Sequence, residues 1–104
     1  MPVILYVGKD GCGACAKWEN QAWNPALADR GLTERFAFRV SKRIEPAWDR
    51  HVAGFPTILA IDTNTWNLWF SSEVHRKDPI PAIKYSGAVD IGSFRSWLFG
   101  LHIV

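Results

Sequence analysis

The chain has 104 residues, 48% of them hydrophobic, so it is long and apolar enough for a single domain, residues 1–104, with its own core. Its formal net charge of +2 is too small to indicate a partner, and acidic residues interrupt its basic clusters, which argues against nucleic acid. No apolar run approaches the ~20 residues that span a bilayer, and two cysteines are too few for a disulfide-rich secreted framework, so we expect a cytoplasmic protein with no membrane partner.

The first half of the chain predicts a strand, a helical stretch and a second strand. Residues 3–7 are a short, continuous apolar run ended by Gly8, which is typical of a buried strand. A helix is predicted next by apolar residues at helical spacing: Cys15, Trp18, Ala22, Trp23 and Ala26. The Asn-Pro pair at 24–25 then marks either a kink or the start of a second short helix that Gly31 stops. Alternating apolar residues over 36–40 predict the second strand.

The second half predicts a short helix, two strands and a final helix. Residues 45–52 are helical in character, and Pro56 introduces a strand over 57–61. Residues 83–85 form the last strand, before a helix that Asp90 can cap. The apolar face of that helix consists of Ile91, Phe94, Trp97 and Leu98. The element order β-α-β-α-β-β-α indicates an α/β fold with a parallel or mixed central sheet covered on both faces.

The two cysteines of the chain, Cys12 and Cys15, lie three positions apart after the first predicted strand. At a helix start, residues three positions apart lie on one side of the helix, about 5–6 Å apart, so their side chains are within reach of a disulfide. Cys12 lies among the unpaired N–H groups of the first turn, which lower the pKa of a thiol, whereas Cys15 is more protected. This asymmetry predicts a redox couple with Cys12 as nucleophile and Cys15 as resolving thiol. Gly13 and Ala14 between them are small, so a substrate backbone could approach closely.

Two other interpretations of the cysteines stay open at this point. A zinc site needs about four ligands, and besides the cysteines the chain offers His51, His75 and His102, which form no paired spacing. We therefore predict no metal. The other alternative is that both cysteines are structural core residues without chemistry. Their position between a strand and a helix favours the redox couple over both alternatives.

Three motifs, in the same order along the chain, resemble thioredoxin and the catalytic domains of protein disulfide isomerase. They are CGAC at 12–15, GFPT at 54–57 and YSGAVDIGSFRSWL at 85–98. The resemblance covers most of the chain and implies a minimal thioredoxin fold. In this chain we expect an extended connection between the last two strands, because residues 63–82 match no part of the family. The resemblance also implies that Pro56 is cis and lies against the cysteines, a geometry that proline adopts at low cost. The backbone of Phe55 would then pair with an extended substrate, and Gly87 would line the same groove.

The sequence departs from that family around the cysteines. Gly11 stands where the family's usual tryptophan precedes the first cysteine. Tyr6 takes the place of the buried aspartate that helps to deprotonate the resolving thiol in thioredoxins. We therefore expect no anionic base near Cys15, and a resolution step that speeds up with pH through about 8. The chain also starts directly on the strand that leads to the cysteines, a layout closer to the smaller glutaredoxins.

Residues 63–82 fit none of the predicted elements. Trp66, Leu68 and Phe70 alternate as in a strand, with Trp69 pointing the other way, which predicts a hairpin extension packed on the domain. The alternative is an exposed aromatic patch for a partner protein.

These observations predict a dithiol–disulfide oxidoreductase with no bound cofactor. The thiolate of Cys12 attacks a protein or small-molecule disulfide, Cys15 resolves the mixed disulfide, and the couple is left oxidised. A reductase or a thiol pool supplies the electrons. The rival is an interaction module that keeps the fold and binds a partner protein through its groove or through the Trp66–Phe70 segment. A third alternative is a dimer bridged by an iron–sulfur cluster through Cys12.

Overall fold

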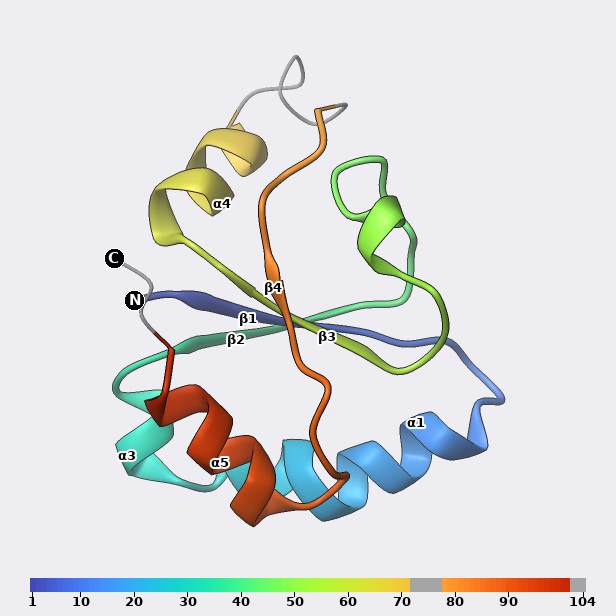
Figure 1. Cartoon of the computed structure of the whole chain (residues 1–104), viewed down its shortest axis with the longest axis vertical. Helices are drawn as coiled ribbons and strands as arrows, with labels where there is room; N and C mark the ends of the chain where they lie inside the picture. Colours follow the sequence, from blue (N-terminus) through green and yellow to red (C-terminus); the bar gives the residue numbers. More distant parts are fainter. Residues whose placement is uncertain (72–77, 102–104) are drawn as a thin grey trace.

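The structure, a computed structural model, describes residues 1–71 and 78–101, which form an α/β fold around a mixed sheet (Figure 1). The strands of the described part are β1 Val3–Val7, β2 Ala37–Ser41, β3 Thr57–Ile61 and β4 Ile83–Lys84. Their order in the sheet is β2-β1-β3-β4. Strand β1 is parallel to β2 and antiparallel to β3, and β4 is antiparallel to β3. The predicted α/β class and the mixed central sheet are therefore confirmed.

The central strands β1 and β3 are buried along their whole length, as the apolar run of residues 3–7 predicted for β1. Their side chains alternate between the two faces of the sheet, because successive residues of a strand point in opposite directions. Ile4 and Tyr6 of β1 join the core cluster on one face, and Val3, Leu5 and Val7 join the other. We call the first the disulfide face, because Cys15 lies in its cluster, and the second the far face.

Most helical segments lie on the disulfide face, on one side of the sheet in Figure 1. They are α1 Gly13–Trp18, the π-helical turn η1 Glu19–Trp23, α2 Asn24–Leu27, α3 Arg30–Thr33 and α5 Ile91–Phe99. The far face is covered by the segment around the 3-10 turn η2 Asp49–His51 and by α4 Thr63–Ser71. Within residues 1–71 and 78–101, no helix has the length and apolar character needed to cross a membrane.

The disulfide face has an aromatic core centred on Trp18. The centroid of the Trp18 ring lies 4.8 Å from that of Phe94 and 5.7 Å from that of Tyr85. Tyr6 of β1 adds an edge contact to Trp18 with the centroids 6.5 Å apart. Trp18 is only 1% exposed, and truncation of such a buried aromatic typically costs about 3–5 kcal/mol. This cluster therefore ties α1, α5 and the sheet together.

The far face has a smaller aromatic group, formed by Trp48, Trp66 and Trp69. The ring centroids of Trp48 and Trp69 are 4.9 Å apart, and those of Trp66 and Trp69 are 5.3 Å apart. The chain that continues from residue 78 closes this side, because the backbone N–H of Ile80 donates to the carbonyl of Ala47 at 2.8 Å. The far face is thus covered by α4 and by two loop segments.

A short helix, α2, begins at the Asn-Pro pair, which is one of the two alternatives predicted for residues 24–25, but the backbone before it is already helical through α1 and η1. In a regular α-helix, a proline ring clashes with the carbonyl four residues earlier. Here the turn before Pro25 is a wider π-turn, in which the N–H of Asn24 donates to the carbonyl of Glu19. The wider turn accommodates the proline without ending the helix.

Two shorter predictions are also corrected. Gly31, expected to stop a second helix, lies inside α3, and Asp29 caps that helix by accepting from the Gly31 N–H at 2.9 Å. The helix expected over 45–52 is reduced to the single turn η2.

The hairpin extension predicted within residues 63–82 is wrong in its described part, because Thr63–Ser71 forms the helix α4. Asp62 starts this helix, since its carboxylate accepts from the N–H of Asn64 at 2.7 Å. The carbonyl of Asp62 accepts from the N–H of Trp66 at 2.9 Å, which is the first helical hydrogen bond. The connection between β3 and β4 is therefore helical where an added strand was expected.

The aromatic residues of α4 explain why the helix prevails over the strand. Trp66 and Trp69 are three residues apart, so in a helix both lie on one side and meet Trp48 of the far face. A strand would have separated them to opposite faces. Residues 72–77, which also belong to the predicted extension, lie outside the described residues.

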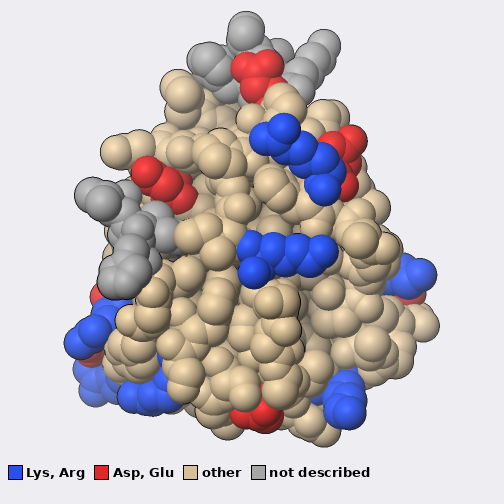
Figure 2. All heavy atoms as spheres, in the orientation of Figure 1, with Lys and Arg blue, Asp and Glu red and all other residues tan. Residues whose placement is uncertain are grey.

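Charged side chains are dispersed over the face of the molecule seen in Figure 2. Basic groups gather at the lower left of this view and again near the top, and acidic groups lie beside both gatherings.

Candidate active site

The end of β1 positions Cys12 at the start of helix α1. A short loop leads from Val7 to Cys12, which is the N-cap of α1. Gly11 in this loop has a φ of +70°, a left-handed conformation in which any side chain would be strained. This accounts for the glycine at the position where the resembled family has tryptophan. The Sγ of Cys12 accepts from the backbone N–H of Cys15 at 3.1 Å, and such a donor stabilises a thiolate.

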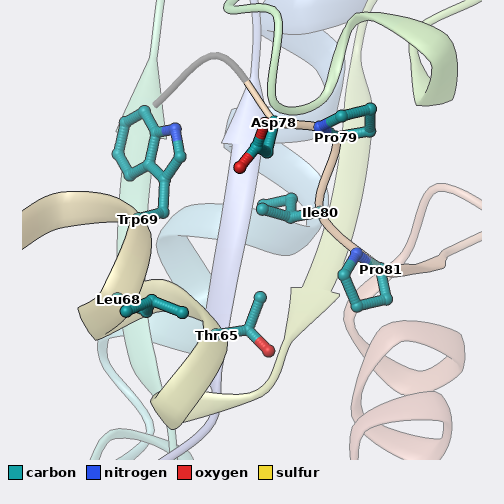
Figure 3. Close-up of a pocket in the computed structure, with 7 residues that line it drawn as sticks. All are labelled: Thr65, Leu68, Trp69, Asp78, Pro79, Ile80 and Pro81. Atoms are coloured by element: carbon teal, nitrogen blue, oxygen red, sulfur yellow. The ribbon is translucent and has the colours of Figure 1, made fainter. Parts of the chain in front are cut away.

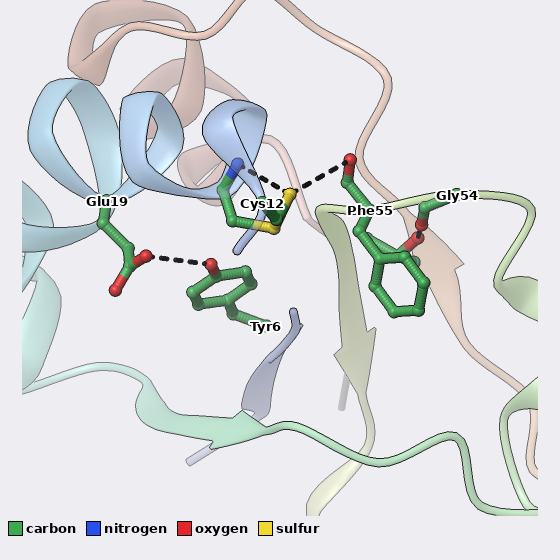
Figure 4. Close-up of a disulfide and its surroundings, with 7 residues drawn as sticks. Tyr6, Cys12, Glu19, Gly54 and Phe55 are labelled. Atoms are coloured by element: carbon green, nitrogen blue, oxygen red, sulfur yellow. Dashed lines mark hydrogen bonds between the residues drawn. A yellow bond between two sulfur atoms is a disulfide. The ribbon is translucent and has the colours of Figure 1, made fainter. Parts of the chain in front are cut away.

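Cys12 and Cys15 form a disulfide, with their Cα atoms 5.2 Å apart (Figure 4). Cys15 is 1% exposed within the aromatic cluster of the disulfide face, whereas Cys12 is partly exposed and packs against that cluster. Gly13 and Ala14 between them are exposed. An attacking thiolate therefore reaches the sulfur of Cys12 more easily than that of Cys15. This is the asymmetry that the spacing predicted.

The loop before β3 lies beside the disulfide (Figure 4). The carbonyl oxygen of Phe55 is 4.0 Å from the Sγ of Cys12, and because a disulfide sulfur carries no hydrogen, this is a van der Waals contact. The peptide bond between Phe55 and Pro56 is cis, as the resemblance implied. The hydroxyl of Thr57 donates to the carbonyl of Gly54 at 2.6 Å and holds this turn. The structure thus brings Phe55 next to Cys12, and the pairing of its backbone with a substrate stays a prediction.

A pocket of about 440 Å³ opens beside the disulfide. Both cysteines line it, together with backbone and small side chains of the loop and of α1. Its charged lining residues are Lys9, Asp10, Glu19 and Lys42. Two of these groups are basic and two acidic, so the pocket as a whole has no strong preference for the charge of a substrate. Gly13 lines the pocket, whereas Ala14, Pro56 and Gly87 are not among its described lining residues.

Tyr6 is fully buried and turns its hydroxyl toward Glu19, as Figure 4 shows. The hydroxyl donates to Oε2 of Glu19 at 3.2 Å. Burial raises the pKa of Tyr6 to about 12, and the charge of Glu19 and this hydrogen bond act in the same direction. The phenol therefore stays protonated near neutral pH and holds the carboxylate of Glu19 in place.

A carboxylate thus lies in the disulfide pocket although Tyr6 occupies the position of the expected aspartate. Glu19 and Cys15 both line this pocket, and the expectation that Cys15 has no anionic base near it stays a prediction. Sequence reasoning missed Glu19, although a residue four positions after Cys15 lies one helical turn away and could have been considered. Gly8 makes the arrangement feasible, since a Cβ there would lie 2.8 Å from the Tyr6 hydroxyl.

Gly87 lies against Tyr85, which belongs to the aromatic cluster of the disulfide face. A Cβ at Gly87 would lie 2.5 Å from the Tyr85 hydroxyl, and that hydroxyl donates to the carbonyl of Ala88 at 2.5 Å. Burial, and then the charge of Asp90, raises the pKa of Tyr85 above its ordinary value. The packing of Tyr85 therefore requires a glycine at this position, and a role of Gly87 in a substrate groove stays a prediction.

The described residues contain no group of three or more histidine, cysteine, aspartate or glutamate side chains that could hold a metal ion. Both cysteines are in the disulfide. His51 donates through Nε2 to the carbonyl of Ile80 at 2.9 Å. His75 and His102, the other histidines considered for zinc, lie outside the described residues.

The chain matches no protein-family model, no curated protein and no solved structure. The chemistry open to this site therefore follows from the disulfide and its surroundings alone. When a thiolate attacks the accessible sulfur of Cys12, a mixed disulfide forms and the Cys15 sulfur leaves as a thiolate. A second external thiol then displaces Cys12, so that the two external thiols end as a disulfide and both cysteines are reduced. The resulting pair of thiols can return those electrons to another disulfide. The geometry is therefore compatible with dithiol–disulfide exchange.

Proposed function

We propose that the protein is a thiol–disulfide oxidoreductase of the thioredoxin fold, which exchanges electrons with protein or small-molecule disulfides through Cys12 and Cys15. The observation that carries the proposal is the disulfide between a partly exposed sulfur at a helix N-cap and a buried sulfur one turn further on. In this arrangement one sulfur is open to attack, and the other is protected until the first has reacted.

The reaction begins in the reduced protein, where the Cys12 thiolate attacks a substrate disulfide. A bond forms between Cys12 Sγ and one substrate sulfur, and the other substrate sulfur leaves as a thiolate and takes up a proton. The Cys15 thiol then loses its proton, its sulfur bonds to Cys12 Sγ, and the second substrate sulfur leaves. The substrate has gained two electrons and two protons, and the protein carries the disulfide observed here. A reductase or a thiol pool returns the electrons without a bound cofactor.

The fold supports the assignment to the thioredoxin type. The mixed sheet and the positions of α1 and α5 support this layout, although the single turn η2 replaces the helix expected between β2 and β3, and α4 is an added helix between β3 and β4. A substrate bound over the exposed Gly13 and Ala14 would meet the carbonyl of Phe55 beside Cys12. Pro56 and Gly87 join this groove on the resemblance alone.

Catalysed reduction of a disulfide substrate tests the proposal. The wild-type protein should accelerate the reduction of insulin by dithiothreitol, whereas the Cys12→Ser/Cys15→Ser double variant should give only the uncatalysed rate. Circular dichroism would confirm that the double variant is folded. Equal rates for the folded double variant and the wild-type protein would show that the proposal is wrong.

A second candidate is an interaction module that binds a partner protein at α4. Leu68 and Phe70 of α4 are 54% and 59% exposed, and a pocket of about 280 Å³ lies between α4 and residues 78–81 (Figure 3). Trp69 and Ile80 line this pocket. For such a module, Phe70→Ser should abolish partner binding while both cysteines are intact, and the insulin assay should show no acceleration.

A further inference from the structure

Strand β2 forms one edge of the sheet, and in the described part of the chain it pairs with β1 alone. The N–H of Ala37 and the carbonyl of Ser41 face β1, because each bonds at 2.9 Å to a residue that flanks that strand. Backbone groups of successive strand residues point in opposite directions, so those of Phe38 and Val40 point to the open edge. Such an edge can pair with a further extended chain.

The side chains of β2 alternate between the two faces of the sheet. Phe38 and Val40 are paired with Ile4 and Tyr6 of β1, so they lie on the disulfide face. Arg39 lies between them and belongs to the far face. Phe38 packs against the core, whereas Val40 is 52% exposed and Arg39 is also exposed. The open edge therefore presents apolar side chains on one face and a cation on the other.

The guanidinium of Arg39 is held at this edge. Its Nη1 donates to the carbonyl of Phe38 at 3.0 Å, and that carbonyl is one of the groups that point outward. A carbonyl oxygen has two lone pairs, so it can accept a further donor. Residues 35–44 contain no acidic residue and four basic ones, namely Arg35, Arg39, Lys42 and Arg43. A segment that pairs with β2 therefore meets backbone groups and positive charge together.

We propose that the edge of β2 binds an extended acidic segment of a partner protein, which adds a strand to the sheet. Acidic side chains of the segment lie beside Arg39 on the far face, and apolar ones lie beside Val40 on the disulfide face. Opposite charges and apolar pairs on neighbouring strands are stabilising, and the backbone hydrogen bonds of the added strand supply affinity. An alternation of acidic and apolar residues is therefore the pattern that this surface recognises. The proposal does not use the cysteines, so it is tested independently of the proposed function.

Two other occupants fit this edge less well. A second copy of the chain, paired through its own β2, brings the basic residues of 35–44 in one copy against those of the other, and like charges on neighbouring strands are destabilising. Basic side chains are a common means of keeping edge strands from pairing with each other. A nucleic acid satisfies the basic side chains but forms no strand ladder with Phe38 and Val40. An acidic peptide segment uses both features.

Backbone NMR of the isotope-labelled oxidised protein tests the proposal with a synthetic peptide of about seven residues in which glutamate and valine alternate. The amide signals of Phe38 and Val40 should shift most, because their N–H groups gain acceptors. The signals of Ile83 and Lys84 should stay in place, since β4, at the other edge of the sheet, has only these two residues. A peptide with lysine in place of glutamate should bind at least about fivefold more weakly.

Charge reversal on the protein tests the contribution of Arg39. Arg39→Glu should weaken binding of the glutamate peptide by at least about fivefold and should strengthen binding of the lysine peptide. Lys17→Glu is the matched control, because it makes the same change of net charge at an exposed position of α1. This control should change either affinity by less than about twofold.

Methylated peptides separate strand addition from simple attraction between charges. Methylation of the backbone nitrogens of the valines alone, or of the glutamates alone, removes the N–H groups from one edge of the bound peptide. One of the two methylated peptides should lose binding and the other should keep it, because only one edge of the added strand faces β2. Loss with methylated valines indicates an antiparallel strand, and loss with methylated glutamates indicates a parallel one.

Absence of shifts at Phe38 and Val40, or equal binding of the two methylated peptides, would overturn the inference. A wild-type dimer in sedimentation, with the amides of Phe38 and Val40 protected from hydrogen exchange, would overturn it in favour of a second copy. Single-stranded DNA that binds more tightly than the glutamate peptide, and loses binding in Arg39→Glu, would overturn it in favour of a nucleic acid. The insulin assay is unaffected by each of these results, so the proposed function is judged separately.

Discussion

The two faces of the sheet are built by the same strands but covered in different ways. On the disulfide face, α1, η1, α2 and α5 enclose an aromatic core around Trp18, and the buried hydroxyls of Tyr6 and Tyr85 both have acceptors. On the far face, the nine residues of α4 leave Leu68 and Phe70 exposed and a pocket beside Trp69. The disulfide thus lies on the face with the larger and more fully covered aromatic core.

This difference indicates which face of so small a protein can hold the groups of a reactive site in fixed positions. On the disulfide face, the disulfide and the carbonyl of Phe55 lie beside each other. Such precision depends on side chains whose own positions are held by packing and hydrogen bonds. The disulfide face provides that support, whereas α4 can change its exposed residues without moving the cysteines.

The largest contrast in catalysed insulin reduction is expected between substitutions of the cysteines and substitutions of the exposed residues of α4. Cys12→Ser should reduce catalysed insulin reduction to the background rate, because no nucleophile remains. Cys15→Ser should accumulate the mixed disulfide, detectable by mass spectrometry, because the attacking sulfur is present and the resolving one is not. Phe70→Ser should retain the wild-type rate, and a large loss of turnover in this variant would contradict the separation of the two faces.

The second largest difference is expected between the contributions of the two aromatic groups to the free energy of unfolding. Trp18→Ala should lower the free energy of unfolding by roughly 3–5 kcal/mol, because it empties the centre of the disulfide-face core. Trp66→Ala should cost roughly 1–2 kcal/mol, since Trp66 is only half-buried on the far face. Urea unfolding of both oxidised variants measures this difference. Equal losses would mean that both faces contribute alike to stability.

A smaller contrast is expected between two glycines near the site. In Gly8→Ala the new methyl group would lie 2.8 Å from the Tyr6 hydroxyl, so overpacking should cost roughly 1–3 kcal/mol of unfolding free energy. In Gly54→Ala the methyl group would have no atom within 4 Å, and the change should stay within about 0.5 kcal/mol. The two variants add the same atom, and a matching loss in both would show that Tyr6 does not need the space above Gly8.

The smallest effect is expected at Asp90, which caps α5 on the disulfide face. Its carboxylate accepts from the N–H of Ser93 at 2.7 Å and from the Ser93 hydroxyl at 3.0 Å, and the pKa of Asp90 is held below its ordinary value, first by the backbone bond. Since the folded-state pKa is depressed, this stabilisation is present above the ordinary pKa of 3.8 and is lost as the pH falls through the lower folded value. Asp90→Asn should therefore weaken the acid dependence of the thermal unfolding midpoint, measured from about pH 7 to pH 2. An unchanged acid dependence would show that the charge of Asp90 contributes nothing to the cap.

The sequence by itself determined the features that depend on local pattern. The apolar run of residues 3–7 predicted the buried strand β1, and the apolar spacing from Cys15 onward predicted the buried side of the helical stretch. The position of Cys12 between them followed from these two elements. The cap by Asp90 was also readable, because it depends on residues only three positions apart. Each of these features depends on interactions that short segments make or on their hydrophobic periodicity.

Only the tertiary structure decided the features that depend on distant partners. Residues 63–71 carry both a strand-like alternation and a helical spacing, and the packing of Trp66 and Trp69 against Trp48 selects the helix. Glu19 becomes part of the site because the hydroxyl of Tyr6, from a different element, reaches its carboxylate. Contacts between residues far apart in the sequence leave no periodic signal along the chain, so their effect is visible only once the chain is folded.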